Sequence, residues 1–246
     1  MSTSRSITTF VVWASLLTHV FGCGINIINR CPYTVTTCAQ SNRDQQFKGK
    51  LNQYNLGAGQ SQYLDFGSSC VWRNGAVWPS VRGKCESAFV PNEANDWDVT
   101  NWAELNLNAN GLDYYDVSNV VAFTLPMMIR PTNPSQQPSG RQCGSPKCII
   151  NDIRGFCKGN NKLIQFPTGA LVCQNTDGLA ERGPTDGTRI FKNACPDAYS
   201  YNFDDDTSVF ACPTGTNYEV IFCPTSGVTN DTSNEESLLM EEVQME

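Results

Sequence analysis

Twelve cysteines, spread from Cys23 to Cys223, constrain this chain of 246 residues more than any other feature. None of them forms a CxxC pair, so their spacing does not favour a zinc site. The last three, Cys195, Cys212 and Cys223, punctuate two strand-like runs that core burial alone can hardly stabilise. We therefore predict that all twelve cysteines form six disulfides, some of them to distant parts of the chain, with no metal site.

The first 22 residues have the pattern of a secretory signal peptide. Arg5 precedes a short apolar run from Ile7 to Phe21. That run is shorter and more polar than the ~20 apolar residues of a membrane span. Cleavage after Gly22 keeps all twelve cysteines, whereas cleavage after Gly24 would leave an odd number. We expect cleavage after Gly22 and a secreted, extracellular protein without a transmembrane segment.

The only histidine, His19, falls within the predicted signal peptide. A mature chain without histidine excludes Ser-His-Asp and Cys-His nucleophiles and histidine-ligated metals. Any chemistry must then use carboxylates, tyrosines or lysines, and we expect no cofactor.

The negative charge is concentrated at the C-terminus. The formal net charge is −7, and removing Arg5 makes it −8, of which six charges lie in the tail 228–246. The remaining body carries only −2 and has no basic stripe, which argues against nucleic acid as a partner. The acidic tail lacks aromatic residues and is predicted to be disordered. Asn230 in this tail begins the one Asn-x-Ser/Thr glycosylation motif of the chain.

Short runs rich in β-branched and aromatic residues predict strands, for example at 33–36, 62–66 and 120–125. Glycine- and asparagine-rich turns separate them, and no long amphipathic helix stands out. Many short strands with regular turn signals are typical of a sandwich or barrel. We therefore expect a mainly β fold.

A proline-rich connector at 130–140 indicates a domain boundary. Beyond it, cysteines sit among glycines, asparagines and prolines with little periodicity, which predicts a disulfide-rich loop subdomain. We expect a β-sandwich core formed by 23–135 and 195–227, with the subdomain at 136–194.

Residues 29–35 read NRCPYTV, and residues 195–201 and 217–224 read CPDAYSY and NYEVIFCP. These resemble the opening and closing motifs of the thaumatin-like proteins, pathogenesis-related group 5. Three further blocks follow in family order, at 102–105, 112–118 and 123–127. The resemblance spans about 25–224 and implies a β-sandwich core, a disulfide-rich second domain and a cleft between them.

The resemblance also implies four disulfides. They join Cys31 to Cys223, Cys143 to Cys212, Cys148 to Cys195, and Cys157 to Cys173. Typical long members of the family carry more cysteines than this chain, so the remaining four have no family guide. We expect local pairs for these, Cys23 with Cys38 and Cys70 with Cys85.

Members of this family carry an acidic cleft associated with β-1,3-glucan binding, built from one arginine, one glutamate and three aspartates. By position, Glu104, Asp116 and Asp197 match three of the five. Two positions are apolar here, since Val121 stands where the family has an aspartate and Ala76 where it has the arginine.

Glu104 and Asp116 are the expected catalytic pair, because glycoside hydrolysis needs one protonated and one ionised carboxyl. They lie on opposite sides of the turn at 108–111, so a chain reversal can bring them together. Asp197, Tyr114 and Trp102 are the expected binding residues, the aromatic rings by stacking on sugar faces.

Without the resemblance, Glu104 and Asp116 would be interpreted as solvated or turn-stabilising carboxylates, because geometry identifies a catalytic pair. The acidic run 204–206 lacks the EF-hand spacing and is predicted to be a solvated loop. Tyr199 and Tyr201 alternate along one strand, which predicts that one of them lies in the core.

The resemblance implies a secreted protein of defence or cell-wall remodelling that binds β-1,3-glucan or a related cell-wall polysaccharide. Any endo-β-1,3-glucanase activity should be weak or absent because Val121 and Ala76 are apolar. An alternative is a disulfide-stapled scaffold that binds or inhibits a protein, such as a foreign hydrolase. A fully active glucanase is a third reading. We expect a monomer in each case.

Overall fold

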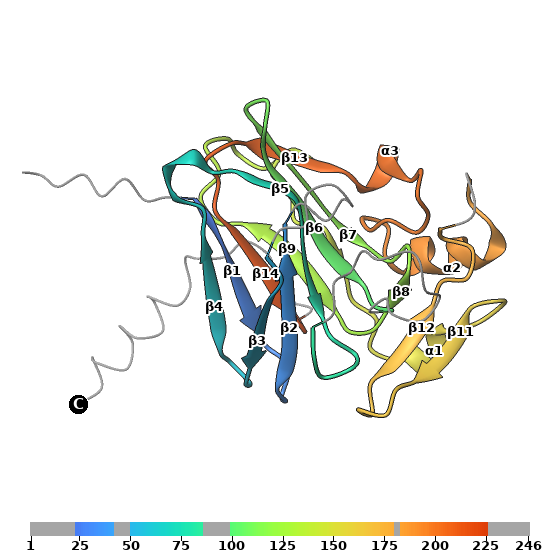
Figure 1. Cartoon of the computed structure of the whole chain (residues 1–246). Coiled ribbons are helices and arrows are strands. Elements are labelled where there is room, and N and C mark those ends of the chain that lie inside the picture. Colours follow the sequence, from blue (N-terminus) through green and yellow to red (C-terminus); the bar gives the residue numbers. More distant parts are fainter. Residues whose placement is uncertain (1–22, 42–49, 86–98, 180–182, 226–246) are drawn as a thin grey trace, which may run out of the picture.

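The computed structural model describes residues 23–41, 50–85, 99–179 and 183–225. Two large β-sheets face each other, and a smaller third sheet lies at one side with the helices (Figure 1). The predicted mainly β sandwich is confirmed. The predicted signal peptide, the acidic tail and Asn230 lie outside the described residues. No helix within the described ranges is long and apolar enough to cross a membrane.

The larger sheet has six strands in the order β13-β7-β6-β5-β2-β3, and neighbouring strands are antiparallel. Its strands are β2 (Val35–Gln40), β3 (Asn52–Leu56), β5 (Trp72–Pro79), β6 (Trp102–Ala109), β7 (Leu112–Ser118) and β13 (Phe210–Pro213).

The second sheet has five strands in the order β10-β9-β14-β1-β4. Its strands are β1 (Gly24–Asn29), β4 (Ser61–Asp65), β9 (Met127–Pro131), β10 (Lys147–Cys148) and β14 (Tyr218–Phe222). β1 and β14 pair in parallel, whereas the other neighbours are antiparallel. Because β1 and β14 come from opposite ends of the described chain, this pairing closes the fold.

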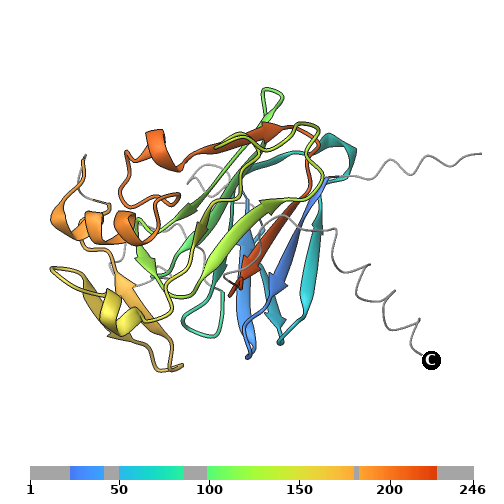
Figure 2. The ribbon, with the colours of Figure 1, turned by 180° about the vertical axis from the view of Figure 1, so that it is seen from behind.

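The third sheet has the order β11-β12-β8. Its strands are β8 (Ala122–Phe123), β11 (Lys162–Gln165) and β12 (Leu171–Gln174), and the short helices are η1 (Gly67–Ser69), α1 (Ile153–Phe156), α2 (Asp186–Ala194) and α3 (Asp205–Ser208). Seen from behind, α1, α2 and the β11–β12 hairpin gather on one side of the sandwich (Figure 2). The strand expected at 120–125 is shorter in the structure, where β8 comprises only Ala122 and Phe123.

The predicted subdomain at 136–194 is connected to the core through two sheets. β10 pairs with β9 in the five-stranded sheet, and β12 pairs with β8 in the small sheet. The division into a core and a subdomain stays a prediction. Within this region, the sequence reading missed α2, which begins with a capping box formed by Thr185 and Thr188.

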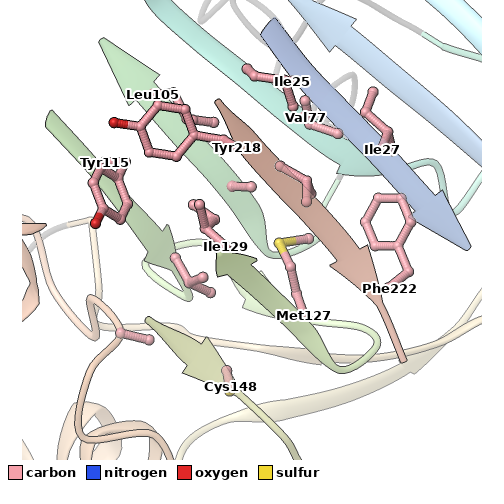
Figure 3. Close-up of a cluster of buried hydrophobic side chains, with 14 of the residues drawn as sticks. Ile25, Ile27, Val77, Leu105, Tyr115, Met127, Ile129, Cys148, Tyr218 and Phe222 are labelled. Carbon is pink, nitrogen blue, oxygen red and sulfur yellow. The ribbon is translucent and has the colours of Figure 1, made fainter. Parts of the chain in front are cut away.

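Alternating side chains fill the space between the two large sheets. Ile25 and Ile27 on β1 and Leu105 on β6 are buried in one hydrophobic cluster (Figure 3). The rings of Tyr115 and Tyr218 come from the two different sheets, with centroids 5.1 Å apart. Burial of each aliphatic side chain such as Ile25 or Leu105 stabilises the folded state by about 1.5–3 kcal/mol. Since the inward positions of β6 are apolar, its alternate positions point to the outer face of the sheet.

One carboxylate, Asp113, is buried in this core. It accepts hydrogen bonds from the backbone N–H of Asn108 at 2.7 Å, the hydroxyl of Tyr218 at 2.9 Å and the hydroxyl of Thr214 at 3.3 Å. Burial raises the pKa of Asp113, and these hydrogen bonds oppose the shift. Asp113 thereby ties the β6–β7 hairpin to β14 in the facing sheet.

Six disulfides use all twelve cysteines. Four of them are the pairs that the resemblance implies, Cys31–Cys223, Cys143–Cys212, Cys148–Cys195 and Cys157–Cys173.

The other two disulfides are Cys23–Cys70 and Cys38–Cys85, so the expected local pairs Cys23–Cys38 and Cys70–Cys85 are wrong. Cys23 precedes β1 and Cys38 lies on β2, and these strands belong to different sheets. β1 instead pairs with β4 in antiparallel orientation, so the end of β4 lies beside Cys23. The backbone N–H of Phe66 donates to the Cys23 carbonyl at 3.1 Å, and the chain then continues to Cys70.

Peptide mapping under non-reducing conditions should recover one fragment that links Cys23 to Cys70 and another that links Cys38 to Cys85. Thiol labelling of the denatured, unreduced protein should give no signal. Recovery of a Cys23–Cys38 fragment, or any labelled cysteine, would contradict the observed strand pairing.

The buried tyrosines predict a loss of stability in alkaline solution. Burial raises the pKa values of Tyr115 and Tyr218, so the folded state keeps protons that the unfolded chain releases near pH ~10. The free energy of unfolding should therefore fall as the pH rises above this value. We expect part of the phenolate absorbance to appear together with the loss of circular dichroism. If all tyrosines ionise while the circular dichroism spectrum still shows a folded chain, burial does not raise these pKa values.

Candidate functional site

Polar side chains gather on the outer face of β6 and β7. The antiparallel register places Glu104 directly opposite Asp116, and Trp102 opposite Ser118. Residues that face each other in this way have Cβ atoms about 5 Å apart. Glu104 and Asp116 are both partly buried. The chain reversal at 108–111 thus brings together the two carboxylates of the expected catalytic pair.

A pocket of about 240 Å³ opens over this pair, and we call it the acidic pocket. It is lined by Glu104, Asp116, Ser118, Val120, Tyr199, Asn202 and Asp205. The last three come from a segment far along the chain. That segment is fixed to β7, because the backbone N–H of Tyr199 donates to the Val117 carbonyl at 2.9 Å and the Asn119 N–H donates to the Tyr199 carbonyl at 2.9 Å.

Tyr199 lies close to the three carboxylates that line the acidic pocket. It donates a 2.5 Å hydrogen bond to the Asp205 carboxylate. Burial raises the pKa of Tyr199, and the hydrogen bond to Asp205 and the negative charges of Asp116, Asp205 and Glu104 raise it further. Tyr199 therefore stays protonated at physiological pH and shares the pocket with three carboxylates, of which it hydrogen-bonds Asp205. Neither Tyr199 nor Tyr201 is a core residue, which corrects the prediction for this pair.

The acidic run 204–206 is only in part the solvated loop expected from the sequence, because Asp205 and Asp206 are exposed but begin α3, whereas Asp204 is buried. Asp204 is only 6% exposed. It accepts hydrogen bonds from the Ser200 N–H at 3.0 Å and the Thr207 hydroxyl at 2.7 Å, and pairs with the Lys192 ammonium at 3.1 Å. Burial lowers the pKa of Lys192, and Asp204 opposes that shift. Asp204 thus holds the segment that presents Asp205 to the acidic pocket.

The remaining expected binding residues lie apart from the acidic pocket's lining. Asp197 is not among the described residues of that lining, and its negative charge partly opposes the lowering of the Lys192 pKa by burial. Tyr114 is 40% exposed, two residues before Asp116 on the same face of β7. Trp102 is buried, so most of its ring is not available for stacking on a sugar.

Sequence reasoning missed Tyr199 and Asp205 as pocket residues. The acidic run 204–206 was the only signal for Asp205, and the sequence could not show which of its three carboxylates faces β7. Tyr199 reaches the pocket through a β-bridge with Ser118. These residues lie far apart in the sequence, so local sequence patterns could not reveal the contact.

Next to the acidic pair, the same sheet becomes apolar. Ala76 lies opposite Glu104 in the register of β5 and β6 and is fully buried, and Val121 is buried as well. Both belong to a cluster with Trp78 and Trp102, whose ring centroids are 6.4 Å apart. The two positions where the resemblance implies charged residues are therefore part of a small hydrophobic core.

Residues 29–224 match the family model described as the Thaumatin family. The chain belongs to the thaumatin family. A thaumatin-like protein from Actinidia deliciosa is 34% identical over 242 aligned residues, which cover 90% of this chain and 98% of the relative. The pathogenesis-related thaumatin-like protein 3.2 of Cryptomeria japonica is 34% identical over 235 residues, covering 86% and 97%.

A solved structure shares the fold of this thaumatin-family protein. It is a laminaripentaose-producing β-1,3-glucanase in complex with laminaritetraose, with a TM-score of 0.51 and 10% sequence identity. The match covers 82% of this chain and 98% of the glucanase.

The ion pair of Lys192 and Asp204 predicts different effects for two neighbouring aspartates. Asp204→Asn removes the anion from a largely buried ammonium and should lower the free energy of unfolding by about 2 kcal/mol. Asp206→Asn changes an exposed residue and should cost no more than about 0.5 kcal/mol. Chemical denaturation of both variants measures the difference, and equal midpoints would show that Asp204 does not anchor this segment.

Proposed function

We propose that this protein binds β-1,3-glucan, or a related neutral cell-wall polysaccharide, in the acidic pocket. The observation that carries the proposal is the cross-strand pair of Glu104 and Asp116, which shares its pocket with the hydrogen-bonded pair of Tyr199 and Asp205. Carboxylates accept hydrogen bonds from sugar hydroxyls, and such charge-assisted bonds are stronger than neutral ones. Asn202 adds a side chain that both donates and accepts.

Membership of the thaumatin family and the pathogenesis-related relative support a role in defence or cell-wall remodelling. The β-1,3-glucanase with laminaritetraose supports the fold only, since it is 10% identical to this chain. The saccharide class therefore rests on the chemistry of the acidic pocket together with the family.

We further propose that hydrolysis is weak or absent. A hydrolytic site needs one carboxyl that donates a proton and one that stays ionised. Within the described part of the chain, the residues that line the acidic pocket include no lysine or arginine to differentiate the carboxylates or to orient a sugar. Ala76 and Val121, where the resemblance implies an arginine and an aspartate, are packed into the apolar cluster instead.

The proposal includes secretion. Six disulfides persist in an oxidising compartment such as the extracellular space. Cys23 forms a disulfide with Cys70, so cleavage of a signal peptide after Gly24 would leave Cys70 without its partner. The structure is thus compatible with the expected cleavage after Gly22.

Glu104→Gln tests the acidic pocket, because it preserves shape and hydrogen bonding while it removes the ionisable group. Binding of linear β-1,3-glucan should change by no more than a few fold, and any trace of reducing-sugar release should disappear. Glu219→Gln, on β14 in the other sheet, is the matched control and should change neither quantity.

Hydrolysis that persists unchanged in Glu104→Gln would rule out Glu104 as the catalytic group. Absence of glucan binding by the parent protein would refute the proposed function. That result would favour a scaffold that binds a protein through its surface loops.

A further inference from the structure

A larger pocket of about 530 Å³ lies elsewhere on the molecule, and none of the described residues lines both this pocket and the acidic pocket. It forms where the start of β2, the end of β5, the connection from β8 to β9 and the β11–β12 hairpin meet. The turn after β5 lies beside the tip of this hairpin in both views (Figures 1 and 2). Its volume is within the range of about 300–1,000 Å³ that is usual for small-molecule sites.

Among the residues that the structure describes, the lining of this second pocket is uncharged and rich in hydroxyl groups. These lining residues include no aspartate, glutamate, lysine or arginine. Its hydroxyl side chains are Tyr33, Thr34, Thr36, Ser80, Thr124 and Thr168. An uncharged lining cannot compensate an ionic ligand for lost hydration, whereas hydroxyls beside apolar side chains suit a neutral molecule that has both hydroxyl groups and apolar faces. Sugar rings have this chemistry.

Tyr33 presents an aromatic ring at the edge of the second pocket and is 55% exposed. The loop that carries it is fixed from below by the buried side chain of Asn29. The Asn29 amide donates to the carbonyls of Tyr33 and Leu56 at 2.7 Å each, and its oxygen accepts from the Cys31 N–H at 2.9 Å. A rigid tyrosine supplies contact area at a small cost in conformational entropy.

Two threonines of the lining add a fixed contact and a hydroxyl group that has no hydrogen-bond partner among the described residues. The Thr168 hydroxyl donates to the Val81 carbonyl at 2.6 Å, which joins the β11–β12 hairpin to the turn after β5. The Thr124 hydroxyl is buried and has no hydrogen-bond partner among the residues that the structure describes. Such a group in a pocket wall is a position that a bound hydroxyl can satisfy.

We propose that the second pocket is a separate binding site for a neutral oligosaccharide, with Tyr33 as the stacking surface and Thr124 as a hydrogen-bonding group. The site does not depend on Glu104 or Asp116. A protein with two such sites would hold a polysaccharide at two positions, which increases its overall affinity for an insoluble wall.

The test is a residue-resolved NMR titration of the full mature protein. The neutral probes are linear β-1,3-gluco-oligosaccharides and xylo-oligosaccharides, and the charged probe is an oligogalacturonate. At least one neutral probe should shift the signals of Tyr33, Thr34 and Thr168, and these shifts should persist in Glu104→Gln. The charged probe should leave them unchanged.

Four variants separate a binding role from a structural one. Tyr33→Ala should weaken binding at this pocket about tenfold, whereas Tyr33→Phe should retain it because the ring remains. Thr124→Val should weaken it severalfold. Tyr63→Ala is the matched control, since Tyr63 is 47% exposed on β4 and does not line this pocket.

Unchanged affinity in Tyr33→Ala, or shifts confined to the acidic pocket, would overturn the proposal. Shifts at Tyr33 without shifts near Glu104 would support it and would count against the proposed function of the acidic pocket. The two proposals can therefore fail independently.

Discussion

The parallel pairing of β1 with β14, secured by the Cys31–Cys223 disulfide, is the constraint on which the rest of the structure depends. This bridge closes a loop with a sequence separation of 192 residues. Closing a loop of that length stabilises the fold by about 5 kcal/mol in the chain-entropy model. β14 then brings Tyr218 to Asp113, and Asp113 fixes the β6–β7 hairpin that carries Glu104 and Asp116. Closure of the chain thus determines the geometry of the acidic pocket.

The remaining lining residues of the acidic pocket, Tyr199, Asn202 and Asp205, are positioned by other interactions. The Cys148–Cys195 disulfide and the pair of Lys192 and Asp204 position the segment after α2, which then lies against β7. As a result, Glu104 and Asp116 on the sheet share the acidic pocket with Asp205 at the start of α3. The neighbouring residues Ala76 and Val121 are buried in an apolar cluster. Under the proposed function, this arrangement favours hydrogen bonding to sugar hydroxyl groups over proton transfer.

The fold class and four of the six disulfides could be predicted from the sequence, because motifs reflect local geometry and the family resemblance implies cysteine pairs. The closing motif and its cysteines indicated the fold, and the turn at 108–111 indicated that Glu104 and Asp116 are neighbours. Contacts that depend on sheet order could not be predicted. Cys23 meets Cys70 because β1 pairs with β4, and Asp205 enters the acidic pocket only because residue 199 lies beside β7. Helix α2 was missed although Thr185 and Thr188 carried a local capping signal.

The proposed function requires that Glu104 and Asp116, brought together by strand register, form a saccharide-binding pocket with Tyr199 and Asp205. A crystal structure of the mature protein with a linear β-1,3-gluco-oligosaccharide tests this most directly. The account predicts a sugar ring in the acidic pocket, with hydroxyl groups within hydrogen-bond distance of the Glu104 or Asp116 carboxylate. An acidic pocket free of sugar under conditions where the protein binds the oligosaccharide would contradict it.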